Sequence, residues 1–234
     1  MEWFTAEHAV LLAAIDYAAA QGFDIHTWQL PCILTPFLYM GAPARFVATH
    51  KTAVAAAERL GDRAAQALIL ATLGTACFSF GRCHEVDTYV QEAHTYLQRG
   101  RTLYQGLDDR NGQAKIYYCL SKVCDWQGQH SQALTYAQYA LDLYMKLGDT
   151  YYTTGNHSAA HHAWQQALDL LLYRLDHHTH ADTVRTVRAK LATLSTDPYA
   201  DSYRHAKLRI RHQGQEAVSS GGHESHQSPC VPGD

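Results

Sequence analysis

The chain has 234 residues, of which 47% are hydrophobic and 18% charged, and its formal net charge is −3 with histidine neutral. These values are typical of a folded protein with a substantial core, and the length suits one large domain or one extended array. Because the sequence has no basic excess, the composition argues against direct nucleic-acid binding, and the lack of an acidic tail argues against a histone-like partner.

The cysteines and the N-terminus predict a cytoplasmic protein. The six cysteines include no CxxC pair, and most fall on apolar helical faces, as expected in a reducing compartment. Residues 1–4 contain no basic n-region and do not resemble a signal peptide. We expect Pro, Asp or His to break the longest apolar runs, so no membrane-spanning segment is predicted.

Hydrophobic periodicity predicts an all-α protein. Gly22, Gly81 and Gly128 are expected to end helices, and Pro31 and Pro36 to kink or shorten the second one. No segment alternates with a period of two, so no sheet is predicted. The predicted helices cover residues 5–21, 24–40, 44–60, 63–80, 84–105, 112–127, 131–147, 157–173 and 181–194.

The composition changes after Leu194. Residues 195–198 are expected to end the helical pattern. Residues 199–212 are basic, and residues 213–234 are rich in Gly, Ser, His, Gln and Pro. We therefore predict a helical-repeat domain over residues 1–194 and a tail over residues 195–234, largely disordered from about residue 213. The basic stretch is expected to be a solvated part of that tail.

A recurring glycine indicates an array of helical hairpins. Gly41, Gly81, Gly128 and Gly155 are each followed by an alanine twelve residues later, at Ala53, Ala93, Ala140 and Ala167. One helical pattern that returns after about forty residues is typical of repeat arrays, which bind partners and seldom carry out chemistry. The three glycine intervals are 40, 47 and 27 residues.

Two of these intervals predict irregularities. The 47-residue interval exceeds the period by seven residues, which we interpret as two extra turns in helix 84–105. The 27-residue interval implies a missing helix near Gly148, and two hypotheses remain open. Residues 131–153 form one long helix antiparallel to 157–173, or the chain breaks at Gly148 and Asp149, since glycine inside a helix costs about 1 kcal/mol.

The repeat pattern resembles the tetratricopeptide motif, and the match is best over Leu147, Gly148, Tyr151, Gly155, Ala160, Trp164 and Ala167. Residues 2–8, 27–31, 49–53 and 60–63 further resemble the C-terminal repeat region of actinobacterial STAND-type regulators. Those proteins join a DNA-binding or activation domain, an NB-ARC nucleotide-switch domain and a tetratricopeptide sensor. The resemblance covers roughly residues 2–194 and implies a superhelix of antiparallel hairpins. The sequence contains no GxxxxGK[ST] loop and no evident helix-turn-helix, so only the sensor part is expected here.

The resemblance implies a module that binds a protein or peptide in a concave groove and acts on a nucleotide-switch domain in trans. A stand-alone scaffold or adaptor is the alternative, and a metal-dependent enzyme that uses the histidine clusters is a weaker one. We predict no enzymatic activity, no cofactor and no membrane partner.

The groove is expected along the first helix of each hairpin. Among the candidates, Lys115, Lys122 and Trp126 combine two cations with an indole, which suits a peptide carboxylate or an acidic segment. The alternative is that Trp126 and Tyr118 belong to the core between repeats and the lysines are merely solvated. The candidate groove residues are Trp28, Thr35, Tyr39, Leu68, Thr75, Phe78, Lys115, Tyr118, Lys122, Asp125 and Trp126.

The histidine clusters are weaker candidates. His157 and His161 have the i, i+4 spacing that can chelate Zn or Ni, and His162 is adjacent. A catalytic site would need a third ligand and a glutamate base, and the HExxH motif is absent. We therefore expect these histidines to be solvent-exposed, and we predict no metal site and no catalytic residue.

Overall fold

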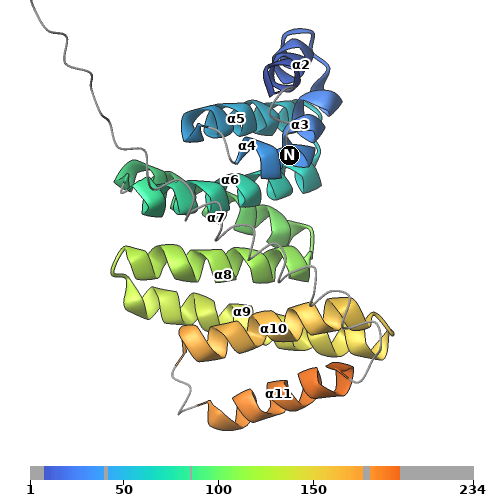
Figure 1. Cartoon of the computed structure of the whole chain (residues 1–234), viewed down its shortest axis with the longest axis vertical. Helices are drawn as coiled ribbons and strands as arrows, with labels where there is room; N and C mark the ends of the chain where they lie inside the picture. Colours follow the sequence, from blue (N-terminus) through green and yellow to red (C-terminus); the bar gives the residue numbers. More distant parts are fainter. Residues whose placement is uncertain (1–7, 40–41, 85, 176–179, 196–234) are drawn as a thin grey trace, which may run out of the picture. The chain divides into compact units, whose positions relative to one another are not determined.

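The computed structural model describes residues 8–39, 42–84, 86–175 and 180–195 (Figure 1). Within these ranges the chain is all-α, without strands, which confirms the predicted fold class. The helices are α2 (His8–Ala20), α3 (Asp24–Ile33), α4 (Thr35–Leu38), α5 (Pro43–Arg59), α6 (Arg63–His84), α7 (Asp87–Gly106), α8 (Arg110–Trp126), α9 (His130–Thr153), α10 (His157–Tyr173) and α11 (Ala181–Ser195).

The chain divides into two compact units, residues 1–187 and residues 188–234. The described part of the second unit is the end of α11, residues 188–195. The predicted disordered tail lies outside the described residues. All packing discussed below belongs to the first unit.

Consecutive helices of the first unit pack as neighbours, in chain order from α5 to α10 (Figure 1). The predicted helix 24–40 is divided at Leu34 into α3, which contains Pro31, and α4, which has Pro36 in its first turn. The two prolines thus shorten this helix as predicted. The chain is an all-α helical repeat.

Close helix packing depends on small residues in the core. The side chains of Leu73, Ala93 and Leu97 are fully buried between α6 and α7. Gly74 of α6 faces Leu97, and a Cβ atom at residue 74 would lie 2.7 Å from the Leu97 Cγ. Glycine at this position therefore lets α6 and α7 approach more closely than any other residue would.

Several helices end in the same glycine turn. Gly61 after α5 has φ +67°, and the amide of Asp62 donates to the Ala57 carbonyl over 3.1 Å. The Asp62 carboxylate then accepts from the amide of Ala65 at 2.9 Å and caps α6. Gly22, Gly128 and Gly155 also have positive φ, which confirms the predicted helix ends at Gly22 and Gly128.

Two predictions about the 47-residue interval are wrong. Gly81 does not end a helix, because α6 continues to His84 and Gly81 packs on Val90 of α7. The helix α7 has 20 residues against 17 in α5, so it does not contain two extra turns. Most of the additional length lies between Gly81 and the start of α7.

The fused-helix hypothesis for the 27-residue interval is confirmed. The helix α9 runs without a break through 24 residues from His130 to Thr153, with Gly148 buried inside it. It packs against α10, so one helix serves both the third and the fourth hairpin. The predicted break at Gly148 and Asp149 is wrong.

One helix meets the length and composition criteria for a membrane span, contrary to the expectation that charged or helix-breaking residues interrupt every long apolar run. Residues Arg63–Cys83 of α6 have a mean hydropathy of 1.5. Within the fold, 61% of this stretch is buried, so its apolar character is accounted for by packing against neighbouring helices.

Candidate functional site

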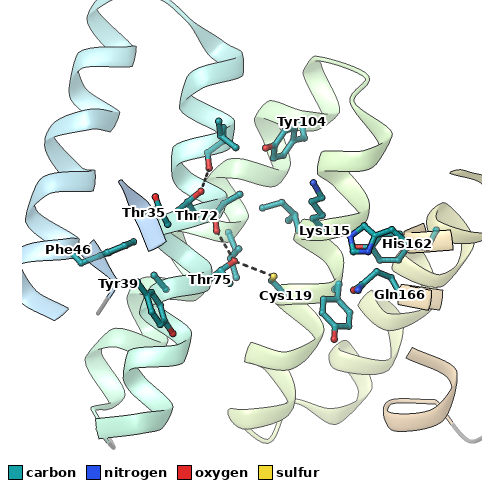
Figure 2. A pocket seen from close by; sticks show the side chains of 17 residues that line it. Thr35, Tyr39, Phe46, Thr72, Thr75, Tyr104, Lys115, Cys119, His162 and Gln166 are labelled. Atoms are coloured by element: carbon teal, nitrogen blue, oxygen red, sulfur yellow. Dashed lines mark hydrogen bonds between the residues drawn. The ribbon is translucent and has the colours of Figure 1, made fainter. Parts of the chain in front are cut away.

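A pocket of about 470 Å³ lies on the face formed by the first helices of the hairpins (Figure 2). The helices α4, α6, α8 and α10 contribute most of its wall, and α5, α7 and α9 add Phe46, Leu97, Tyr104 and Tyr144. Its surface is mainly apolar. A pocket of this size with a few polar groups is typical of ligand sites in proteins.

Sequence reasoning found part of this wall. Thr75, Lys115 and Tyr118 line the pocket, because they occupy one face of α6 and α8 at helical spacing. Tyr39, directly after α4, also lines it, 41% exposed and stacked on Phe80 with ring centroids 5.0 Å apart. Thr35 and Leu68 complete the set of predicted residues found there.

Three other candidates, Phe78, Lys122 and Trp126, form a second feature together with Arg82 and with Tyr118 of the pocket wall. We call these five residues the cation–aromatic strip. The Lys122 ammonium lies 3.8 Å from the centroid of the Tyr118 ring. The Arg82 guanidinium lies 5.7 Å from the ring of Phe78 and 5.8 Å from that of Trp126. Phe78 is buried, whereas Trp126 is 51% exposed, so Trp126 is not a core residue.

Asp125 and Trp28 lie elsewhere. Asp125 forms an ion pair with Arg174, at the end of α10, and a hydrogen bond of 3.0 Å with the Nδ1 of His130, at the start of α9. The carboxylate therefore connects the ends of three helices. Trp28 is half-buried against the small core cluster that contains Val54 and Ile69, and it does not line the pocket.

The cations of α5 are arranged differently from those of the pocket and the strip. Each cation of α5 pairs with a carboxylate of a neighbouring helix. The pairs are Arg45–Asp16, Lys51–Glu92 and Arg59–Asp24. By contrast, Arg82, Lys115 and Lys122 have no carboxylate partner among the described residues. Among the described residues, the positive charge of the pocket and the strip is therefore not paired with a carboxylate.

A buried histidine supports the pocket wall. His50 of α5 is 0% exposed, and its ring stacks on Phe46 with centroids 3.9 Å apart. Its Nδ1–H donates to the Phe46 carbonyl at 3.0 Å, and its Nε2 lies 3.3 Å from the Thr35 hydroxyl. Burial lowers the pKa of His50 to about 4, so the ring is neutral at physiological pH. Sequence reasoning missed His50, although a histidine amid the apolar residues of helix 44–60 was a visible signal.

The cysteine in the pocket is not an activated nucleophile. The Cys119 Sγ lies 3.4 Å from the Thr75 hydroxyl, and burial raises the pKa of the Cys119 thiol. Burial likewise raises the pKa of Cys124. A thiol of this kind is protonated at neutral pH and reacts slowly.

The described histidines do not assemble a metal centre. Across the described ranges, no three His, Cys, Asp or Glu side chains are grouped so that they could hold a metal ion. His157 stacks on Tyr152, with ring centroids 5.5 Å apart, and His161 is exposed. His177 and His178 lie outside the described residues.

The helix α10 contributes two pocket residues that sequence reasoning did not place there, His162 and Gln166. The helix α9 continues through Gly148, and α10 packs directly against it. The short interval of 27 residues between Gly128 and Gly155 was the feature of the sequence that indicated this continuous helix.

No protein-family model and no curated protein matches the sequence. Among solved structures, the chain is similar to the crystal structure of BtubC (BKLC) from P. vanneervenii. The sequence identity is 14% and the TM-score 0.43, with 97% of this chain and 98% of the other covered.

Proposed function

We propose that this chain is a protein–protein or peptide interaction module that binds an acidic segment of a partner along the cation–aromatic strip. The observation that carries the proposal is the placement of Arg82 and Lys122 on aromatic rings, with no carboxylate partner for either among the described residues. The acidic partner would supply the carboxylates that neighbouring helices supply to α5.

The strip combines the features that make an interface favourable. A cation held over a ring is oriented before binding, so little side-chain freedom is lost when a carboxylate approaches. Charge-assisted hydrogen bonds from Arg82 and Lys122 would then be stronger than those between neutral groups. Trp126, half exposed beside Arg82, adds the aromatic area that is common at the centre of interfaces.

The length of the strip fits a short extended peptide. Tyr118 and Trp126 are eight residues apart on α8, which is about 12 Å along a helix axis. An extended chain covers this distance with about four residues. The basic stretch at residues 199–212 of the same chain has the wrong sign of charge for this surface.

The resemblance to STAND-type regulators suggests the biological setting. In that setting the chain would be a cytoplasmic sensor repeat region, and the partner would be a nucleotide-switch domain in trans. Binding would stabilise one conformation of the array and so shift the population of the switch. The proposal assigns no catalytic step and no cofactor to the chain.

The test measures binding of two synthetic peptides of equal length and apolar content, one rich in Asp and Glu and one rich in Lys. We expect the acidic peptide to bind the full chain, with an affinity that falls as the salt concentration rises. Arg82→Glu with Lys122→Glu should reduce its affinity by about tenfold or more while the chain remains folded.

The matched control is Arg63→Glu with Lys146→Glu, which changes the net charge equally at exposed positions away from the strip. This control should bind the acidic peptide nearly as well as the unmodified chain. Equal binding of the two peptides, or equal loss in the two double variants, would show that the strip does not recognise an acidic segment.

A further inference from the structure

The wall of the pocket is polar at one side and apolar at the other. Figure 2 shows Lys115, His162 and Gln166 together on the side toward α10, and Phe46 and Tyr39 on the opposite side. Thr35, Thr72 and Thr75 lie between them. A ligand that fills this space must therefore be polar at one end only.

The polar side of the wall is positively charged. Lys115 is exposed, and none of the residues that line the pocket is a carboxylate. Lys115 also forms no ion pair or hydrogen bond with the described residues. An anionic group on the ligand would meet this charge, whereas a cationic group would be repelled.

The middle of the wall is poorly suited to a peptide backbone. The hydroxyl of Thr72 donates to the Leu68 carbonyl at 2.9 Å, and that of Thr75 donates to the Ala71 carbonyl at 2.8 Å. The hydroxyl of Thr35 donates to the Pro31 carbonyl at 2.9 Å. Because their protons are used in hydrogen bonds to backbone carbonyl groups of the chain, the three threonines offer no donor to peptide carbonyl groups, and buried carbonyls without donors are costly. A hydrocarbon body has no carbonyl groups and therefore needs no hydrogen-bond donor from the wall.

We infer that this pocket binds a small amphiphilic organic anion, with its acidic group beside Lys115 and its apolar, ring-bearing body toward Tyr39 and Phe46. The volume of about 470 Å³ lies within the range of small-molecule sites. The aromatic side chains of Tyr118 and Tyr144 also line the pocket. This site is separate from the peptide surface proposed above, although Tyr118 contributes to both.

The ligand would contact all the hairpins that form the wall. Residues from α4, α6, α8 and α10 lie around one pocket, so an occupant stabilises their arrangement by the free energy of its binding. The pocket is thus placed to act as an effector site for the interaction surface on the same helices.

The test is a fluorescence titration of the full chain at neutral pH with pyrenebutyrate, pyrenebutanol and pyrenebutylamine, which share one apolar body. We expect one site for pyrenebutyrate, with an affinity about tenfold or more above that of the amine. Lys115→Met should reduce the affinity for pyrenebutyrate about tenfold and leave that for pyrenebutanol unchanged. The control Lys146→Met, at an exposed lysine of α9, should change neither affinity.

Thr75→Trp adds a large side chain to the pocket wall and should reduce the affinity of the pocket for all three probes. If that variant does not fold, Lys115→Met alone decides, because Lys115 is exposed. Equal affinity for the anion and the amine, or an unchanged affinity in Lys115→Met, overturns the proposal. The Arg82→Glu and Lys122→Glu variant should retain pyrenebutyrate binding. If it loses the probe, the anion binds at the strip and not in the pocket.

Discussion

Gly148 of α9 packs directly on the indole of Trp164 of α10. A Cβ atom at residue 148 would lie 2.2 Å from the Trp164 Nε1, a separation that real side chains do not reach. The indole N–H donates to the Asp149 carboxylate at 3.1 Å, which fixes the ring over the glycine. Glycine is therefore present at this position to admit Trp164 and not to interrupt the helix, and α9 continues through it.

We predict that Gly148→Ala destabilises the protein. Alanine is the better helix former by about 1 kcal/mol, but its methyl group must displace the buried Trp164 ring. Overpacking of this kind costs about 1–3 kcal/mol, so a net loss is expected. Urea unfolding, followed by circular dichroism, measures the change in the free energy of unfolding.

The control for this substitution is Gly106→Ala at the last residue of α7. There a Cβ atom would meet only the Arg63 guanidinium at 3.0 Å, the end of a flexible and exposed side chain. This change is expected to be neutral or slightly stabilising. If the two substitutions alter stability equally, the contact with Trp164 does not explain the glycine.

A second prediction concerns Asp108, which has φ +51° at the position after α7 where other helices have glycine. The amide of Asp109 donates to the Tyr104 carbonyl at 3.1 Å, as Asp62 does to Ala57 after α5. Because a residue with a Cβ is strained in this conformation, Asp108→Gly should stabilise the protein by about 0.5 kcal/mol.

The reciprocal substitution, Gly61→Ala, should destabilise the protein by about 1 kcal/mol for the same reason. Both changes are measured by urea unfolding. A loss of stability in Asp108→Gly would mean that the aspartate side chain contributes more to this turn than its backbone strain costs.

Sequence predicted the helices well and the role of each glycine only in part. Gly22 and Gly128 end helices, as their positions after apolar stretches suggested. Gly81 and Gly148 follow similar stretches but lie inside helices, against Val90 and Trp164. A glycine that ends a helix and one that admits a neighbouring side chain look alike in sequence, because the second depends on a residue of another helix.

The sequence likewise predicted only some of the residues of the candidate site. Thr75, Lys115 and Tyr118 follow from helical spacing along α6 and α8, and all three line the pocket. His162 and Gln166 of α10 do not follow, because their position depends on α9 remaining one helix through Gly148. That outcome is set by the packing of Trp164, which offsets the low helix propensity of glycine.

The last prediction is a loss of stability in mild acid that depends on His50. Because the pKa of His50 is about 4 in the fold and 6.5 in the unfolded chain, only the unfolded chain binds the proton between these values. The contribution of the neutral His50 to the free energy of unfolding is therefore complete above pH 6.5. It is lost as the pH falls toward 4, and the loss is about 3 kcal/mol at most. Burial also lowers the pKa of His94, which acts in the same direction. Urea midpoints at several pH values measure the dependence, and it should be clearly weaker in His50→Leu. An identical pH dependence in that variant would mean that other groups carry the effect.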